Sequence, residues 1–493
     1  MKTHNSEKYR PIFHFSPKKN WMNDPNGLVY FKGEYHLFFQ HNPNDSIWGP
    51  MHWGHAVSKD MIEWEELDIA LYPDEHGTIF SGSVVIDWNN TSGFFSKEPG
   101  MVAIFTQNLH DADHTTPIQT QSLAFSHDRG RTWTKYEKNP VLKHPTKVDF
   151  RDPKVFWHYE SEKWIMVLAT GQTVSIYSSP NLIDWQFESE FGENIGCHDG
   201  VWECPDLFEL PVENSEEKKW VMFVSIGDNR QFDSGSRTQY FIGSFDGSNF
   251  KVDENNNEVL WLDFGKDNYA GVTFSDIPKE DGRRIYIGWM SNWRYANEVP
   301  TVGWRGQMTL PRVLTLRKIG DKLRVIQKPV KELDNYFTKQ IVIHDEIISS
   351  GIQKKIDINQ SSVEIVLNVN NLGAKQFGLV LHHTENQSTT ITIDLLTNLL
   401  SLDRTNSGEV SFSENFLNNQ VMKIHDTTKL NLRIIVDSSS VEIFVNEGAH
   451  ALTSLIYPDK ACEKISIFSL GGDIQLCNSY ISFPNSIRRN FGY

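Results

Sequence analysis

Three acidic residues of this chain lie in short segments whose backbone is restricted. Asp24 and Asp152 each precede a proline, and the proline after Asp24 is followed by an Asn-Gly pair. A residue before proline is biased towards extended backbone and Asn-Gly favours a tight turn, so both carboxylates are expected on rigid corners. Glu203 lies between a tryptophan and a cysteine, which would lower the polarity around its carboxyl group and suit it to act as a general acid.

Together the three carboxylates indicate chemistry on a sugar, although each segment alone is also a common turn. Two carboxyl groups can serve as nucleophile and acid/base at a glycosidic bond. Aromatic residues make up 12% of the chain, and aromatic rings complement the C–H faces of sugars. A carbohydrate-binding protein without catalysis would use the same rings but would not need the full set of carboxylates.

No other motif indicates a metal or a cofactor. His52 and His55 could be two metal ligands, but the sequence places no third ligand near them. The chain has no glycine-rich loop of the phosphate- or dinucleotide-binding type. Its four cysteines are too few for a disulfide framework, so we expect them to be reduced. We therefore expect no metal and no cofactor.

The elements that position these residues are short β-rich runs with turns between them. In residues 27–40, Lys32 and Gly33 separate two alternating runs, which predicts a hairpin. A turn with serine first, Asp or Asn two residues later and an aromatic residue at its end recurs at four places, residues 58–64, 126–133, 179–185 and 244–250. Four-stranded units at this spacing over roughly 330 residues predict about five blades of a β-propeller. Four unrelated turns are the alternative, since these residue types populate turns in any fold.

The rest of the chain differs in composition, which predicts a second domain. No tryptophan follows Trp304, although the chain has 15, and strand alternation continues through residues 362–369 and a hairpin at 432–445. Many short strands with polar turns are typical of a β-sandwich. We predict an all-β protein with a five-bladed β-propeller in residues 1–315, a linker in 316–345 and a C-terminal β-sandwich in 346–493.

Charge and hydropathy exclude several classes of partner. The net charge of −16 disfavours nucleic acid and anionic membranes, which are normally met by basic surfaces. No apolar run approaches the roughly 18–20 residues that span a bilayer. The polar start lacks the apolar core of a secretory signal, so we expect a cytoplasmic protein, or a secreted one if this chain is a trimmed form.

Several segments resemble signature blocks of glycoside hydrolase family 32. They are residues 21–27 (WMNDPNG), 48–55 (WGPMHWGH), 80–83 (FSGS), 151–153 (RDP), 203–205 (ECP) and 440–446 (SVEIFVN). The resemblance covers nearly the whole chain. It implies a five-bladed propeller with a C-terminal sandwich, and retaining hydrolysis of terminal β-fructofuranosides.

The resemblance also implies roles for individual residues. Asp24 would attack the anomeric carbon of fructose, and Glu203 would protonate the leaving oxygen and then activate water. Asp152, with Arg151, would hold the fructose hydroxyls and stabilise the transition state. Retaining chemistry predicts that the carboxyls of Asp24 and Glu203 lie about 5–5.5 Å apart. The positions that match the fructose pocket of the family are Trp21, Asn23, Gln40, Trp48, Phe80, Ser81 and Trp293.

The implied substrate is sucrose or a fructan such as levan or inulin. Residues 288–295 and 303–312 are more similar to levanases, inulinases and yeast-type invertases than to sucrose-6-phosphate hydrolases, with bacterial levanase the most similar in appearance. Sucrose-6-phosphate hydrolysis, fructosyl transfer and, least favoured, binding without catalysis remain alternatives. The sandwich could brace the propeller, extend the substrate groove or form a homodimer contact, and the sequence does not choose among these roles.

Overall fold

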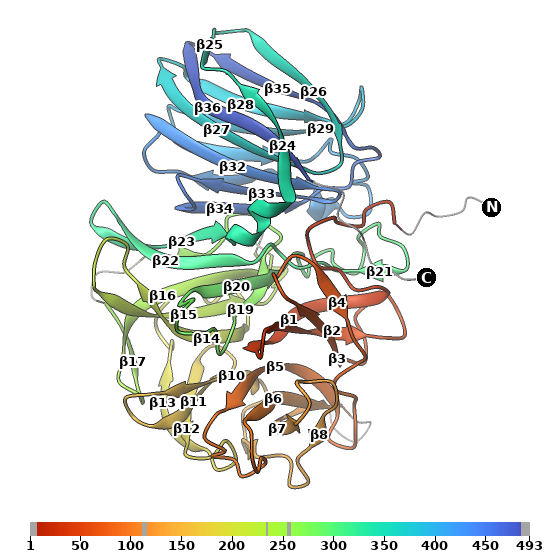
Figure 1. Ribbon diagram of the computed structural model, residues 1–493, viewed down its shortest axis with the longest axis vertical. Helices are drawn as coiled ribbons and strands as arrows, with labels where there is room; N and C mark the ends of the chain where they lie inside the picture. The colour runs from red at the N-terminus through yellow and green to blue at the C-terminus, as the bar shows by residue number, and fades with distance from the viewer. Residues whose placement is uncertain (1–6, 111–115, 233–234, 254–257, 485–493) are drawn as a thin grey trace, which may run out of the picture.

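The computed structural model of the protein describes residues 7–110, 116–232, 235–253 and 258–484. It confirms the expected all-β architecture, a five-bladed β-propeller with a β-sandwich stacked against it (Figure 1). In the described residues the only helices are two short 3-10 helices, η1 (Lys331–Tyr336) and η2 (Glu414–Phe416). None of the helices in this part of the chain is long and apolar enough to cross a membrane.

Each blade is an antiparallel sheet with four main strands in chain order. Blade 1 consists of β1 (Asn20–Phe31), β2 (Glu34–Asn42), β3 (His52–Ser58) and β4 (Trp64–Glu66). Blade 2 consists of β5 (Thr78–Asp87), β6 (Gly100–Leu109), β7 (Ile118–Ser126) and β8 (Thr134–Lys135), with β9 (Leu142–Lys143) beside β7. Blade 3 consists of β10 (Arg151–His158), β11 (Lys163–Ala169), β12 (Val174–Ser179) and β13 (Gln186–Phe191). Blade 4 consists of β14 (Trp202–Pro211), β15 (Lys218–Ile226), β16 (Arg237–Phe245) and β17 (Phe250–Val252), with β18 (Leu260–Trp261) beside β16. Blade 5 consists of β19 (Tyr269–Thr273), β20 (Arg284–Trp289), β22 (Arg312–Ile319) and β23 (Lys322–Pro329). The first strands of neighbouring blades contact one another in a ring, so β1, β5, β10, β14 and β19 surround the central axis.

The repeated turn of the sequence lies at the same place in four blades, between the third and fourth strands. In blade 1, Ser58 Oγ accepts a hydrogen bond from the backbone N–H of Met61 at 2.7 Å, and the indole of Trp64 donates to the carbonyl of Met61 at 2.9 Å. Trp133 and Trp185 close their turns with the same indole-to-carbonyl bond. The four turns are therefore one structural repeat that precedes the outermost strand in these four blades.

The propeller closes through a short strand that comes late in the chain. β21 (Trp304–Arg305) pairs in parallel with the start of β1, and Asn20 N donates to the carbonyl of Gly303 at 2.8 Å. The sheet of blade 1 thus combines strands from the beginning of the propeller sequence with β21 from near its end. This closure fixes the start of β1, which carries the first of the three carboxylates.

The sandwich consists of two antiparallel sheets with a core between them. One sheet contains β24 (Phe337–Ile343), β25 (Glu346–Ile348), β27 (Val363–Leu372), β32 (Lys429–Asp437), β33 (Ser440–Val445), β34 (His450–Leu455) and β36 (Asp473–Pro484). The other contains β26 (Gln353–Gln360), β28 (Gln376–His382), β29 (Ser388–Asp394), β30 (Leu399–Asp403), β31 (Gln420–Lys423) and β35 (Cys462–Leu470). Phe377 is the one aromatic residue among the buried residues of this core, which is otherwise almost entirely Ile, Leu and Val. The absence of tryptophan after residue 304 therefore marks a change from aromatic to aliphatic packing.

The boundary between the two domains differs from the expected one. Residues 316–329, assigned to a linker from composition, form most of β22 and β23 in the fifth blade, and β24 of the sandwich already begins at Phe337. The connection is the short η1 segment. The change in tryptophan content precedes the boundary, because the last two strands of blade 5 pack with leucine, isoleucine and valine.

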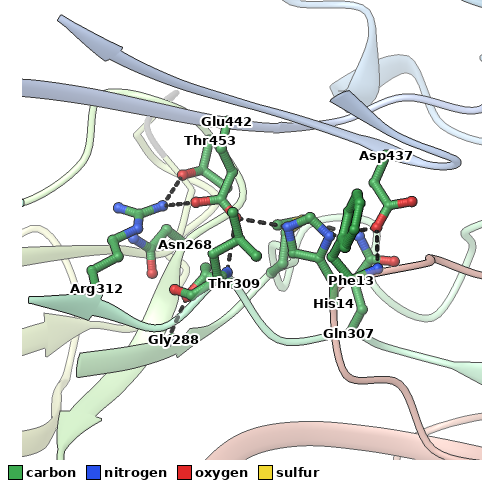
Figure 2. Close-up of polar contacts among 12 residues, drawn as sticks. Phe13, His14, Asn268, Gly288, Gln307, Thr309, Arg312, Asp437, Glu442 and Thr453 are labelled. Carbon is green, nitrogen blue, oxygen red and sulfur yellow. Dashed lines mark hydrogen bonds and ion pairs between the residues drawn. The ribbon is translucent and has the colours of Figure 1, made fainter. Parts of the chain in front are cut away.

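A buried ionic network joins the propeller to the sandwich (Figure 2). His14 lies between Asp437 and Glu442, with a ring nitrogen 2.8 Å from a carboxylate oxygen on each side. Arg312 of β22 donates to Glu442 at 2.6 Å and to Asp263 at 3.0 Å. Although burial lowers it, the hydrogen bonds to the two carboxylates raise the pKa of His14 to about 9. The imidazole is therefore charged at neutral pH and balances two buried carboxylates at the interface.

Candidate active site

The three carboxylates predicted from the sequence are brought together at the central axis. Asp24 lies on β1, Asp152 on β10 and Glu203 on β14, which are the inner strands of three different blades. The thiol of Cys204, next to Glu203, lies 3.6 Å from a carboxylate oxygen of both Asp24 and Asp152. Residues separated by about 180 positions in the chain therefore meet in one cluster.

Irregular pairing aims these side chains at the axis. The inner strand of every blade loses register with its neighbour at the same level, between Met22 and Pro25, Ile79 and Gly82, Arg151 and Lys154, Glu203 and Asp206, and Tyr269 and Val272. Such bulges reorient side chains and occur next to active sites. Asp24, Ser81, Asp152, Glu203 and Tyr269 lie in these interruptions or at their edges.

Backbone strain at Asp152 and Cys204 also indicates that this cluster is a functional site. Asp152 has φ 63° and Cys204 has φ 46°, a left-handed conformation that disfavours residues with a side chain. The strained backbone is held by local hydrogen bonds: Cys204 N donates to Asp152 Oδ2 at 3.0 Å, and Asp152 N donates to Thr106 Oγ1 at 3.0 Å. Strain of this kind persists where the surrounding structure fixes a functional geometry.

Asp24 is fixed through both of its carboxylate oxygens. Ser81 Oγ donates to Oδ2 at 2.7 Å and Asn23 Nδ2 donates to Oδ1 at 3.0 Å. Burial and the nearby charge of Glu203 raise the pKa of Asp24 to about 6, against the lowering effect of these donors. The group is therefore an oriented carboxylate that ionises above about pH 6.

Glu203 is also contacted on both oxygens, but it is more open. Arg151 donates to Oε1 at 3.1 Å, and the hydroxyl of Tyr269 donates to Oε2. The Glu203 side chain is 24% exposed, whereas Asp152 is almost fully buried. Glu203 is thus more accessible to a solvent or substrate molecule than Asp152, and Asp24 is half-buried.

Asp152 lies beneath the other two groups. Burial, together with the charges of Glu203 and Asp24, raises the pKa of Asp152 to about 7, although the guanidinium of Arg151 lowers it. The Nε atom of Arg151 lies 3.9 Å from Oδ2 of Asp152. Burial and the charges of Asp152 and Asp24 also raise the pKa of the Cys204 thiol, so the thiol keeps its proton between them.

The predicted pocket residues divide into a buried support and a rim. Trp21 is fully buried, and its indole donates to Asn23 Oδ1 at 2.7 Å while its ring stacks on Trp293 with centroids 5.9 Å apart. Trp21 therefore positions Asn23 from behind. Trp48 is 45% exposed and meets the ring of Phe80 edge-on, so these two rings form an open aromatic edge.

Gln40 lies on β2, beside the strand that carries Asp24. Its side chain is buried, and its amide donates to Asn26 Oδ1 at 2.9 Å. It supports the part of β1 where the pairing between β1 and β2 shifts.

Tyr269 is a site residue that the sequence analysis missed. It is the first residue of β19 in blade 5, and it precedes a register shift as Glu203 does in blade 4. Asp267 and Asn268 precede it, but no proline restricts the backbone around it as at Asp24 and Asp152. Its equivalent position in the blade repeat was the only available signal.

The histidine pair of the sequence is not a metal site. His55 is buried and pairs with His36, with nitrogens 3.0 Å apart, whereas His52 contacts the carbonyl of Pro50. Within the residues that the structure describes, no group of three or more His, Cys, Asp or Glu side chains could hold a metal ion.

Comparison with known proteins identifies the family of this chain. Residues 14–329 match the family model of the glycosyl hydrolases family 32 N-terminal domain, and residues 332–482 match that of the glycosyl hydrolases family 32 C-terminal region. The levanase of Bacillus subtilis (strain 168) is 48% identical over 478 residues, which are 95% of this chain and 69% of the relative. The extracellular exo-inulinase of Aspergillus awamori is 38% identical over 510 residues, covering 94% of this chain and 93% of the relative.

The fold has the same relatives. A fructofuranosidase variant from Schwanniomyces occidentalis, solved in complex with fructosylnystose, superposes with a TM-score of 0.90 at 35% identity, covering 99% of both chains. The propeller, the sandwich and the sequence thus point to one family, and the chain belongs to glycosyl hydrolase family 32.

Proposed function

We propose that the protein is a retaining β-fructofuranosidase that releases terminal β-D-fructofuranosyl residues from sucrose and from fructans such as levan and inulin. The observation that carries this proposal is the arrangement of Asp24 and Glu203. Asp24 is half-buried and oriented through both oxygens, and Glu203 is partly exposed and held by Arg151 and Tyr269. The relatives named levanase and exo-inulinase support fructans as substrates.

Asp24 is the nucleophile of the proposed reaction. Its hydrogen bonds to Ser81 and Asn23 hold the carboxylate in one orientation, which keeps an attacking oxygen directed at one place. Attack at C2 of the fructosyl unit forms an ester with Asp24, while the bond between C2 and the leaving oxygen breaks. The result is a covalent fructosyl-enzyme.

Glu203 is the acid and then the base. In the first step its proton moves to the leaving oxygen, and in the second it takes a proton from the water that attacks C2 and frees Asp24. Arg151 and Tyr269 direct the two carboxyl oxygens, and the partial exposure of Glu203 lets the leaving group and the water reach it. Retaining chemistry predicts the separation of about 5–5.5 Å between the two carboxyls given above.

Asp152 stabilises the fructosyl unit as positive charge develops on it. A buried carboxylate close to the reacting centre interacts strongly with such a charge, because little water screens it. Arg151 and the thiol of Cys204 hold this carboxylate in place. Its oxygens are also available to accept hydrogen bonds from sugar hydroxyls.

Sugar release from four substrates tests the proposal. The purified protein is incubated with sucrose, levan, inulin and sucrose 6-phosphate, and an Asp24→Asn variant is the control. Free fructose from sucrose or a fructan, lost in the control, supports the proposal. Release from sucrose 6-phosphate alone would assign the protein to that substrate, fructosyl oligomers in place of free fructose would make it a transferase, and no product from any substrate would leave a binding protein.

A further inference from the structure

A second cavity lies at the other end of the strands that carry the active site. Its volume is about 860 Å³, within the range of pockets that bind small molecules. The C-terminal parts of β5, β10 and β14 line it, as does the chain that follows β19. Asp152 near the start of β10 and Trp157 near its end are about 17 Å apart along the strand, at roughly 3.3 Å per residue. The part of the cavity at Trp157 is therefore remote from the three carboxylates, whereas its inner wall, with Lys154 and Asp206, lies only two and three residues along β10 and β14 from Asp152 and Glu203.

An exposed but fixed tryptophan forms one wall. Trp88 is 56% exposed, yet its indole donates to Asp276 Oδ1 at 2.8 Å and its ring packs edge-on against Phe31, with centroids 5.9 Å apart. Asp276 is itself anchored, because its other oxygen accepts the backbone N–H of Ile86 at 3.1 Å. A large apolar ring held in place at the surface is a ready platform for a flat apolar face of a ligand.

Another exposed ring stands at the same cavity. Tyr159 is 70% exposed, and the ammonium of Lys279 lies 5.2 Å from its ring centroid. Trp157 and Trp220 are further rings in the lining. Four of the 15 tryptophans of the chain line this one cavity, although Trp157, Trp164 and Trp220 also pack in the hydrophobic clusters of the blades.

A buried carboxylate with a free acceptor also lines the cavity. Asp206 is fully buried, and its Oδ2 accepts from the backbone N–H of Thr273 at 2.6 Å and lies 3.5 Å from Nζ of Lys154. Its Oδ1 has no hydrogen-bond partner in the described part of the chain. Buried polar atoms are normally paired, so this oxygen is an unused acceptor, but it lies behind the surface of the cavity and out of contact with a ligand there.

The charges around the cavity balance, which indicates the class of ligand. Five Lys or Arg and five Asp or Glu residues line it, in a chain whose net charge is −16. An anion site or a cation site would carry an excess of one sign. Paired donors and acceptors beside aromatic rings suit a neutral molecule with many hydroxyls and apolar C–H faces.

We propose that this cavity is a second carbohydrate site, which binds a non-reacting part of a neutral fructan chain on Trp88 and Tyr159. Such a site raises the local concentration of chain ends at the active site, because binding at one point makes the second contact intramolecular. The hydroxyl-rich, neutral character of the ligand follows from the cavity itself. The choice of fructan as the carbohydrate rests on the proposed function.

Substitution of the exposed rings tests the proposal. We compare wild type, Trp88→Ala/Tyr159→Ala and Tyr159→Ala alone for kcat/KM on high-molecular-mass levan and on sucrose. The matched control is Phe187→Ala, because Phe187 lies on the outer strand of blade 3 and is 52% exposed. In the double variant we expect kcat/KM on levan to fall 3- to 10-fold and kcat/KM on sucrose to stay within 1.5-fold of the wild-type value. The single variant, which removes a ring that is mostly in solvent, is expected to show a smaller loss of the same kind.

Binding without turnover separates this proposal from the proposed function. Retardation of each protein in gels that contain levan or inulin is measured in an Asp24→Asn background. Free fructose is added to saturate the active site, so that the remaining retardation reports binding elsewhere. This remaining retardation is expected to be at least 5-fold weaker for the double variant than for the protein with both rings. Equal retardation of the double variant and the Phe187→Ala control, or equal losses on levan and sucrose, would overturn the second site. A wild-type protein that hydrolyses neither substrate would overturn the proposed function alone, since the gels still report binding.

Discussion

The hydroxyl of Tyr269 donates a hydrogen bond to Glu203 Oε2, and it reaches that carboxyl from blade 5, which contributes none of the three carboxylates. Arg151 occupies the other oxygen of the same carboxyl. The acid/base group on β14 is therefore held from the inner strands on its two sides, β10 and β19. The arrangement of the blades thus places Arg151 and Tyr269 at Glu203, although the three residues are far apart in the sequence.

Loss of the Tyr269 hydroxyl is expected to slow turnover. Tyr269→Phe keeps the ring but removes the donor, so kcat should fall about 10- to 100-fold with little change in the melting temperature. KM should change little, because the hydroxyl holds a group that acts in the chemical step and not in substrate binding. Tyr240→Phe, another buried tyrosine on β16, is the control. An unchanged kcat in Tyr269→Phe would remove Tyr269 from the reaction.

Activity is expected to fall on acidification through about pH 6. Burial and the charge of Glu203 raise the pKa of Asp24 to about 6, and the proposed attack needs the ionised form, which is lost below that value. The hydroxyl of Ser81 lowers this pKa, so Ser81→Ala should move the acid limb of kcat/KM to higher pH. The measurement is kcat/KM on sucrose from pH 4 to 9, and a limb that Ser81→Ala leaves in place would contradict the assignment.

Asp152 is expected to reduce stability at neutral pH. Its pKa is raised to about 7, mainly by burial, so the unfolded chain loses this proton at lower pH than the folded protein does. Ionisation therefore destabilises the fold increasingly as the pH rises from about 4 to 7. Asp152→Asn should be more stable than wild type by about 2 kcal/mol at pH 8 and nearly equal at pH 4, with activity lost. Urea unfolding at both pH values tests this, with Asp321→Asn in the exposed β22–β23 turn as control; a variant that is less stable at pH 8 would contradict it.

His14 is expected to stabilise the contact between the domains below pH 9. Its pKa is raised to about 9 by Asp437 and Glu442 against the effect of burial, so its contribution is complete below its ordinary pKa of 6.5 and is lost as the pH rises through 9. His14→Gln leaves the buried Asp437 without its cation and Glu442 with Arg312 alone, and should cost about 3–5 kcal/mol at pH 6. The melting temperature from pH 6 to 10 should fall for wild type and change less for His14→Gln. His344→Gln, on the exposed surface of the sandwich, should behave as wild type.

Much of the fold and of the carboxylate cluster was predictable from local sequence. The turns at Ser58 and Ser126 carry their own hydrogen-bonding groups, so their repeat identifies the blades. Asp24 and Asp152 stand out because the proline that follows restricts their backbone. Tyr269 does not stand out, because its role comes from the blade to which it belongs. The domain boundary was misplaced because β22 and β23 pack through aliphatic residues, as the sandwich does.

The covalent intermediate on Asp24 is the most direct test of the mechanism. A Glu203→Gln variant is treated with β-fructosyl fluoride, whose leaving group needs no proton from an acid, and the protein is digested and examined by mass spectrometry. Without a base to activate water, the intermediate should accumulate, and the peptide that contains Asp24 should carry one fructosyl unit that is absent when Asp24→Asn is added. Release of fluoride with no adduct on Asp24, or an adduct on another residue, would contradict the retaining mechanism proposed here.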